Sequence, residues 1–309
     1  MRRAHGAALV VVAITMFAAC SGSKSSADVA PDGLLALAAD ATATSLVGWD
    51  ASGGDAIPIT LPKGEPVWVA SGRADVLVLT LASGGLATSD PLHLGTKLAW
   101  RTVKAVGPTG DAPKGPDFFA VWDPQGGRFA TLAGDLVAGD QIRVVLIDPS
   151  VASAFEIPID RPVLAAPPAW IDGDRLVVVT GDAAQPASLI VDTTTGALTE
   201  GPIGARLLAS SANARRIATM AGQGAPVVVR DMSGWLAGDG SSIASVDPPS
   251  GSATAISLAL DATGERLAIA WLARDGTVTL AVHDGATAWR RVAQPKIGSA
   301  HGAVVAWRR

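Results

Sequence analysis

The feature that most constrains the fold is a unit that recurs along the sequence about every 40–50 residues. Four anchor positions mark its copies, and a fifth anchor lies at Trp307. Each copy has an apolar strand before the anchor, then a turn of about four residues rich in Asp, Gly, Asn or Pro, an arginine and a second apolar strand. Turns of this composition between apolar, β-branched segments are typical of hairpins. The four anchors are Trp122, Trp170, Ser210 and Leu260, and the arginines are Arg128, Arg175, Arg216 and Arg266.

A second motif completes the unit, about 15–25 residues further along the chain. It consists of a strand that ends in Asp, a turn of small residues and another strand, as in VVLIDPSVAS and SLIVDTTTGAL. Each unit therefore contains four predicted strands, which we call A to D. Four-stranded units of about 40–50 residues indicate the blades of a β-propeller, so we expect an all-β fold.

The two ends of the repeat region predict how the ring closes. The first unit, from Gly33, begins at its second strand, whereas the final GAVVAW is a first strand with no second strand after it. Propellers often close by pairing such ends, because an open ring would leave strand edges exposed. We therefore expect residues 302–307 to lie antiparallel to the strand around 34–38. Six units over residues 33–309 give about 46 residues each, whereas seven, the alternative, would need about 40.

The units resemble the repeats of WD40-like, or TolB-like, propellers found in bacterial secreted proteins and lipoproteins. The most similar copies are PAWIDGDRLVV with IVDTTTG, and LALDATGERLAIA with AVHDGATA. The resemblance covers nearly the whole chain after its N-terminal segment and implies a propeller, but it implies little about function. Eukaryotic-type WD40 repeats are less similar, since only one predicted third strand ends in a Trp-Asp pair and no Gly-His pair precedes a unit.

The N-terminal segment resembles a bacterial lipoprotein signal peptide. Arg2 and Arg3 precede an apolar run over residues 7–19, and the only cysteine of the chain, Cys20, follows it. As a helix the run would span about 20 Å, which is shorter than a hydrocarbon core of about 30 Å and favours a signal peptide over a membrane span. The resemblance implies cleavage before Cys20 and a lipid on its thiol. Phe17 departs from the pattern, because lipoproteins usually carry Leu there.

The expected organisation has three parts. We expect residues 1–19 to be a signal peptide, residues 20–32 a flexible tether after lipidated Cys20, and residues 33–309 the propeller domain. An ordinary signal peptide with an incidental cysteine and an uncleaved anchor are the alternatives. We therefore place the protein outside the cytoplasm, anchored to the cell membrane. Loss of two arginines and no acid would change the net charge from −4 to −6. Such a chain lacks the basic surface that nucleic acid requires.

No motif in the sequence points to a cofactor or a metal ion, and we expect neither. The chain has no Gly-x-Ser-x-Gly elbow, no phosphate-binding loop and no histidines at metal-binding spacing. His93, His283 and His301 occupy unrelated positions in their units, so we expect them to be exposed or bonded to backbone groups. The IDGD segment is expected to form a hairpin turn rather than a calcium loop.

Ligands usually bind a propeller on the face that carries the D–A and B–C loops, which are the longer loops in this sequence. Polar residues of these loops are the candidates for ligand contact, although a solvated loop residue is the simpler interpretation of each. The candidates are Asp117, Asp140, Gln141, Arg161, Asp182, Arg274 and Asp275.

Two functions fit this sequence. The first is a binding or scaffold module for an envelope protein or glycan, with no catalysis. The alternative is a propeller-fold hydrolase of the glycosidase or lactonase type, with carboxylates gathered in the central funnel. They differ in whether the funnel brings two carboxylates, or a histidine and a carboxylate, within reach of one substrate atom. The sequence does not set the oligomeric state.

Overall fold

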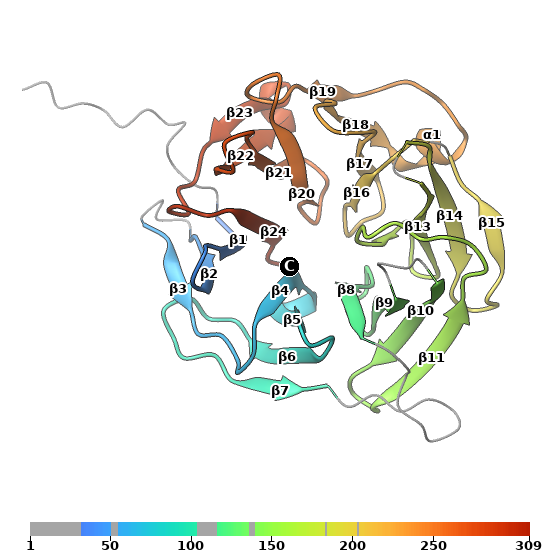
Figure 1. The fold of residues 1–309 in the computed structure, drawn as a ribbon, viewed down its shortest axis with the longest axis horizontal. Helices are drawn as coiled ribbons and strands as arrows, with labels where there is room; N and C mark the ends of the chain where they lie inside the picture. Colours follow the sequence, from blue (N-terminus) through green and yellow to red (C-terminus); the bar gives the residue numbers. More distant parts are fainter. Residues whose placement is uncertain (1–31, 51–54, 104–115, 136–139, 183, 203) are drawn as a thin grey trace, which may run out of the picture.

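The chain forms a ring of six four-stranded antiparallel sheets around a central axis (Figure 1). The computed structural model describes residues 32–50, 55–103, 116–135, 140–182, 184–202 and 204–309. The predicted all-β, six-bladed propeller is confirmed, and the seven-bladed alternative is wrong. The expected signal peptide, residues 1–19, and Cys20 lie outside the described residues.

Each blade runs outward from strand A, at the axis, to strand D, at the rim. Blade 1 contains the last strand of the chain and the first three, and the other blades are continuous in sequence. Blade 1 is β24 (Gly302–Trp307), β1 (Leu34–Ala39), β2 (Thr44–Gly48) and β3 (Ile57–Ile59); blade 2 is β4 (Pro66–Ser71), β5 (Val76–Leu81), β6 (Leu86–Pro91) and β7 (Trp100–Thr102); blade 3 is β8 (Asp117–Trp122), β9 (Phe129–Asp135), β10 (Asp140–Asp148) and β11 (Ser153–Pro158); blade 4 is β12 (Ala169–Trp170), β13 (Arg175–Gly181), β14 (Pro186–Asp192) and β15 (Leu198–Glu200); blade 5 is β16 (Leu207–Ser210), β17 (Arg216–Met220), β18 (Val227–Asp231) and β19 (Ala244–Val246); blade 6 is β20 (Thr254–Leu260), β21 (Arg266–Leu272), β22 (Val278–Asp284) and β23 (Arg290–Ala293).

The burial of each strand follows its place in the blade. The B strands are buried along nearly their whole length, as in RLVVVTG of β13 and RLAIAWL of β21, because a neighbouring blade covers each face. The D strands are short and mostly exposed, as in LTE of β15. Continuous apolar runs therefore mark strands covered on both faces, whereas the polar runs mark the rim.

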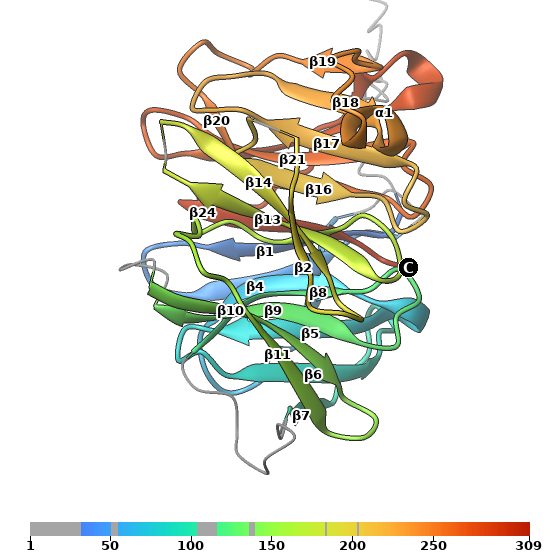
Figure 2. The ribbon, with the colours of Figure 1, turned by 90° about the vertical axis from the view of Figure 1, so that its right-hand side faces the viewer.

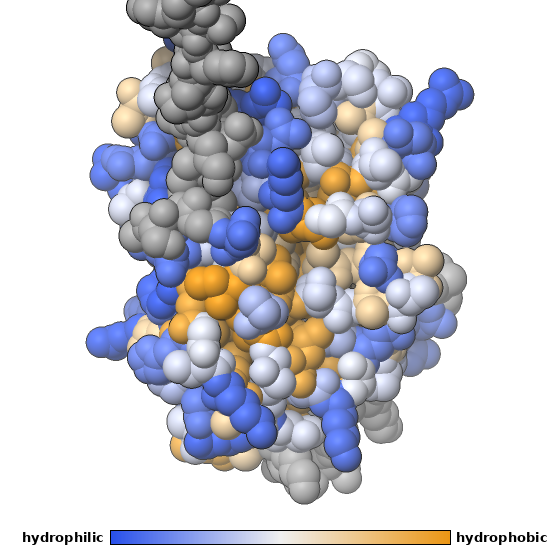
Figure 3. Space-filling view, turned by 90° about the vertical axis from the view of Figure 1, so that its left-hand side faces the viewer, coloured by the Kyte–Doolittle hydropathy of each residue, from blue (hydrophilic) through white to orange (hydrophobic). Residues whose placement is uncertain are grey.

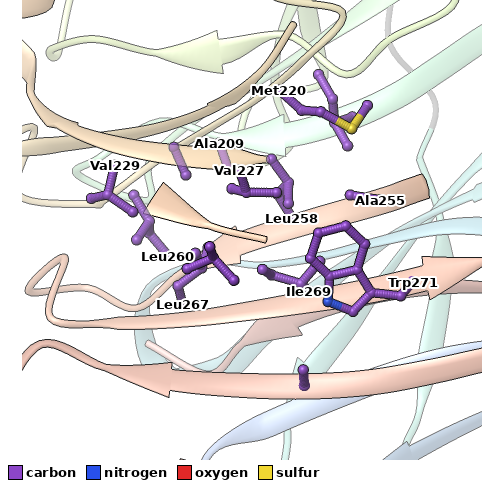
Figure 4. Packing of buried hydrophobic residues seen from close by; sticks show 14 of the residues in the cluster. Ala209, Met220, Val227, Val229, Ala255, Leu258, Leu260, Leu267, Ile269 and Trp271 are labelled. Carbon is purple, nitrogen blue, oxygen red and sulfur yellow. The ribbon is translucent and has the colours of Figure 1, made fainter. Parts of the chain in front are cut away.

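The hydrophobic core consists of six clusters, one at each seam between neighbouring blades. The seam between blades 5 and 6 shows the arrangement: Met220 and Val229 of blade 5 face Leu258, Ile269 and Trp271 of blade 6 (Figure 4). Since each blade contributes to two clusters, no blade completes its core without both neighbours.

The ring closes as the sequence predicts. β24 pairs antiparallel with β1 over six residues, from Leu34 opposite Trp307 to Ala39 opposite Gly302. Figure 1 shows the two ends of the described chain side by side in this blade. Leu34, Val305 and Trp307 also belong to the cluster between blades 6 and 1. The closing strand therefore covers the edge of β1 and completes a hydrophobic seam at the same time.

A second contact, which the repeat does not predict, attaches the closing segment to blade 2. The Asp75 carboxylate accepts hydrogen bonds from Arg308 Nη2 at 2.6 Å and Nε at 3.1 Å, and its other oxygen accepts one from the Arg309 amide at 3.0 Å. Asp75 has a positive φ of 57°. A charged, forked contact of this kind is among the stronger hydrogen-bonded pairs. The closing segment is thus held by blade 1 along β24 and by blade 2 at its end.

Blade 5 departs from the expected pattern of tight turns opposite the ligand face. There the chain forms a helical turn, α1 (Met232–Leu236), after β18 and reaches β19 only at Ala244. Met232 and Trp235 of α1 are buried in the cluster between blades 4 and 5. The expectation that the D–A and B–C loops are the longer ones is therefore wrong for this blade, because two apolar side chains draw the C–D connection onto the core. Figure 2 shows α1 and the C-terminal end on the same flat side of the ring.

Replacing Trp307 with alanine should lower the free energy of unfolding by about 3–5 kcal/mol, the usual cost of truncating a buried tryptophan. Trp307 is 4 % exposed, and its indole N–H donates to the Ala259 carbonyl at 3.0 Å. The measurement is urea denaturation followed by circular dichroism. Trp100→Ala is the matched control: Trp100 is half-buried on an outer strand, so a smaller loss is expected. Equal losses in the two variants would contradict the role assigned to the closing strand.

Candidate functional site

The ring encloses an axial channel lined by the six A strands. Four tryptophans come from these strands, and Trp122, Trp170 and Trp307 are each the last residue of their strand. Arg309 also lines the channel, and Figure 1 places the C-terminal end at the centre of the ring. The anchors of the sequence repeat are therefore the residues that meet around the axis.

Three of these indoles join neighbouring blades. Trp68 Nε1 donates to the Ala120 carbonyl at 2.9 Å, and Trp170 Nε1 donates to the Val121 carbonyl at 3.1 Å. Trp307 makes the same bond to blade 6. Each bond satisfies a carbonyl on the free inner edge of an A strand, so the tryptophans stabilise the ring rather than offer a stacking surface in the channel.

Three of the four repeat arginines contact the next blade, whereas Arg175 pairs with Asp172 of its own turn at 2.6 Å. The guanidinium carbon of Arg128 lies 5.5 Å from the ring centroid of Trp170, and that of Arg266 lies 4.6 Å from Trp307. Arg128 also donates to the Gly173 carbonyl at 2.9 Å. Arg216 packs so closely on the next turn that a Cβ at Gly264, which has a φ of 76°, would lie 2.5 Å from its Cγ. These cation–π and turn contacts explain why arginine recurs after the turn.

The channel is narrow and holds little charge. Its free volume is about 100 Å³, which is room for a few water molecules but falls below the roughly 300–1,000 Å³ of small-molecule pockets. Arg309 is the one charged side chain among the described residues that line it, and its Nη1 donates to the Asp123 carbonyl at 3.1 Å. Burial lowers the pKa of this guanidinium below its ordinary value. The described lining therefore brings no pair of carboxylates to the axis.

The described acid with the most strongly shifted pKa, Asp117, lies elsewhere, at the seam between blades 2 and 3. Asp117, the first residue of β8, donates its backbone N–H to the Gly84 carbonyl of blade 2 at 3.0 Å. Its side chain shares a sheet face with Arg143, since both residues stand opposite Ala133. Arg143 in turn pairs with Glu156 at 2.9 Å. We call Asp117, Arg143 and Glu156 the blade 3 cluster.

The blade 3 cluster holds one carboxyl that is easily protonated. The pKa of Asp117 is raised to about 7: burial is the largest cause, Arg143 opposes the rise, and the nearby Glu156 charge adds to it. Asp117 Oδ1 is buried and accepts no hydrogen bond from any described residue. A carboxyl with such a pKa can donate a proton near neutral pH, and perturbed acids of this kind often mark functional sites. However, Asp117 is the first residue of β8, whereas this strand lines the channel with its last two residues, Val121 and Trp122.

Two strained bulges flank the blade 3 cluster. Phe119 has a φ of 54°, within the register shift between Phe118 and Val121 of β8. Gln141 has a φ of 53°, within the shift between Asp140 and Arg143 of β10. Residues other than glycine rarely adopt this conformation, and such strain tends to gather at binding sites. Three predicted residues, Asp117, Asp140 and Gln141, thus come together at one end of blade 3.

Of the other four predicted residues, Arg161 and Asp182 lie in separate loops next to and within blade 4, and Arg274 and Asp275 share one turn of blade 6. Arg161 donates to Glu200 of β15 at 2.5 Å and pairs with Asp160. The Asp182 carboxylate caps its own loop by accepting from the amides of Ala184 and Gln185, and that of Asp275 accepts from Thr277. Arg274 is exposed on the same loop as Asp275. These contacts are local or structural, and ligand contact by these residues stays a prediction.

The histidines bond backbone groups or are exposed. His283 Nδ1 lies 3.0 Å from the Trp289 carbonyl, His301 Nδ1 lies 3.2 Å from the Gly276 carbonyl, and His93 is exposed. Burial lowers the pKa of His283. Asp172 caps a hairpin turn by accepting from the Asp174 and Arg175 amides. Within the described ranges, no three His, Cys, Asp or Glu side chains gather as metal ligands would.

Comparison with solved structures places the chain among β-propellers. TolB from Acinetobacter baumannii superposes with a TM-score of 0.64 at 14 % identity, covering 90 % of this chain and 68 % of that one. TolB from Agrobacterium tumefaciens superposes with a TM-score of 0.57 at 11 % identity, covering 84 % of this chain and 88 % of that one. A propeller in a nidogen–laminin complex superposes with a TM-score of 0.57 at 11 % identity, covering 88 % of this chain and 98 % of that one. At these identities the likeness shows the fold alone, and at that level it confirms the predicted resemblance to TolB-like propellers.

No protein-family model matches the chain, and neither does any curated protein. Across the part of the chain that the structure covers, no helix has the length and apolar character of a membrane span. The apolar run over residues 7–19 lies outside that part.

Asp117→Asn should change how stability depends on pH. In the folded protein the carboxyl of Asp117 keeps its proton up to about pH 7, whereas in the unfolded chain it loses the proton near pH 4. The wild-type free energy of unfolding should therefore fall, relative to the variant, as pH rises from about 4 to 7, by up to about 1.4 kcal/mol per pH unit.

Urea denaturation at several pH values measures this slope. Glu265→Gln is the control, because Glu265 is exposed and its loss should leave the slope of the wild type in place. Parallel curves for the wild type and Asp117→Asn would show that Asp117 is ionised in the fold.

Proposed function

We propose that this chain is a lipid-tethered, extracytoplasmic β-propeller that binds an envelope protein or glycan and carries out no chemistry of its own. The observation that carries the proposal is the axial channel. Its small free volume, and the presence of one charged side chain, Arg309, among the described residues that line it, favour binding over catalysis between two carboxylates at the axis. The tether rests on the lipoprotein-like sequence that ends at Cys20.

The alternative, a hydrolase with its site in the funnel, finds one point of support. Asp117 has the raised pKa that a general acid needs. Its position counts against this role, because the carboxyl is packed at a seam between blades and its neighbour Glu156 is already paired with Arg143. Binding is therefore the better account of the described residues.

The outer surface supports a binding role. Figure 3 shows hydrophobic surface gathered on the side of the ring next to blade 1, with hydrophilic residues around it. Gathered apolar surface on a folded domain often marks a contact with another macromolecule. One structural neighbour, the propeller of the nidogen–laminin complex, comes from a protein–protein complex, and we extend that kind of partner to this chain.

Site-specific photo-cross-linking in intact cells tests the proposal. A photoreactive amino acid replaces Asp182 or Arg274 on the D–A and B–C face, and Val151, in a C–D turn, on the opposite face. We expect a discrete adduct from the first face and none from Val151. Adducts from neither face, or turnover of a glycoside or lactone by the purified chain, would contradict the proposal.

The same cells test the tether through Cys20→Ser, because this change removes the only thiol that could carry the lipid. The variant should leave the membrane fraction or accumulate with its signal peptide attached, and it should lose the adduct. Unchanged mass and unchanged fractionation of this variant would rule out lipidation at Cys20.

A further inference from the structure

We infer that a crevice between blades 4 and 5 binds a carboxylate attached to an apolar body, with Arg230 as the residue that recognises the charge. This inference deepens the proposed binding function by naming the chemistry of a ligand. The crevice has a free volume of about 520 Å³, within the roughly 300–1,000 Å³ range of small-molecule pockets. It is therefore several times roomier than the axial channel.

The walls of the crevice come from three parts of the chain. Pro202 and Gly204 leave blade 4, Val228 and Arg230 belong to β18 of blade 5, and Trp235 belongs to α1. The unusual C–D connection of blade 5 continues through Gly238 to Gly240 and forms the remaining wall. The crevice therefore exists because the C–D connection of blade 5 contains α1 in place of a tight turn.

Arg230 is half-buried in this crevice and lacks an acidic partner. Its Nη1 donates to Thr219 Oγ1 at 2.8 Å, and it forms no ion pair with any residue that the structure describes. The repeat arginine of the same blade, Arg216, pairs with Asp231 at 2.7 Å. A guanidinium has five N–H donors in a planar fork that matches a carboxylate. One bond to Thr219 orients the fork and leaves most of its donors available to a ligand.

The lining indicates the rest of the ligand. Apart from Arg230, the polar side chains of the lining are Thr219, which holds the guanidinium, and Asp239, whose carboxylate accepts from Ser241. The other walls are glycine, alanine, proline, valine and tryptophan. A sugar acid would leave many hydroxyls without partners against such walls, and unpaired polar groups are costly. An apolar carboxylate, such as the C-terminal residue of a polypeptide with an apolar side chain, has no hydroxyls to leave without partners.

Isothermal titration calorimetry with the purified full chain tests the inference. The probes are a hexapeptide ending in leucine with a free carboxylate, the same peptide with a C-terminal amide, and glucuronic acid. We expect the free-acid peptide to bind at least about tenfold more tightly than either other probe. The amide lacks the charge-assisted hydrogen bonds to Arg230, and glucuronic acid lacks the apolar contact with the walls.

Arg230→Gln should weaken the binding of the free-acid peptide by about tenfold or more, so that the acid and the amide bind with similar affinity. Arg274→Gln makes the same chemical change at an exposed position outside the crevice and should leave both affinities unchanged. Thermal unfolding of both variants should match the parent, and Arg230→Lys, which keeps the charge without the fork, serves as a second variant if Arg230→Gln does not fold.

Equal binding of acid and amide, no binding of any probe up to about 10 mM, or equal effects of the two glutamine variants would overturn the inference. So would tighter binding of glucuronic acid than of the peptide. An adduct in the photo-cross-linking experiment together with any of these results would overturn the crevice alone and leave the binding function in place.

Discussion

The pairing of β24 with β1 is the contact on which the rest of the fold depends. All six hydrophobic clusters lie between blades, and the two clusters beside blade 1 contain residues of β24, so the core is complete only when the ring is closed. The closing pair joins segments at opposite ends of the domain, Leu34–Ala39 and Gly302–Trp307. Bringing distant segments together costs chain entropy before any contact forms. Trp307, with its bond to Ala259 and its stacked Arg266, offsets that cost where the last seam closes.

The side chains that stabilise the closed ring also limit the space for a ligand along its axis. Tryptophans that satisfy strand-edge carbonyls occupy the channel, and the closing segment adds Arg309 to it. The axial opening, the usual place to look for a site in a propeller, is therefore filled by structural side chains. The recognition that we propose therefore lies further from the axis, at the loops of one face and at seams where a blade departs from its repeat. Blade 5 departs most clearly, and the crevice around Arg230 lies at that departure.

The sequence predicts those parts of the fold that repeat. Trp122 and Trp170, with Arg128 and its counterparts, recur at regular spacing because they occupy equivalent positions in successive blades, so the spacing gives the blade count and the missing strand. Contacts made once leave no such pattern. The bonds from Asp75 to the closing segment, and the pairing of Arg161 with Glu200, join residues with no periodic relation. The same holds for Arg230, which donates to Thr219 and forms no ion pair with a described residue. For Asp117 the sequence predicts only a place in a loop, because its raised pKa depends on burial at a seam.

Native-state hydrogen exchange of the β24 amides that bond β1 tests the central claim most directly. If the closing strand holds the ring together, these amides should exchange only through global unfolding, with the same free energy as the amides of β9 and β21. The denaturant dependence of their exchange should also match that of whole-domain unfolding. Exchange of β24 by local opening, several kcal/mol below the global value while β9 and β21 stay protected, would contradict the account.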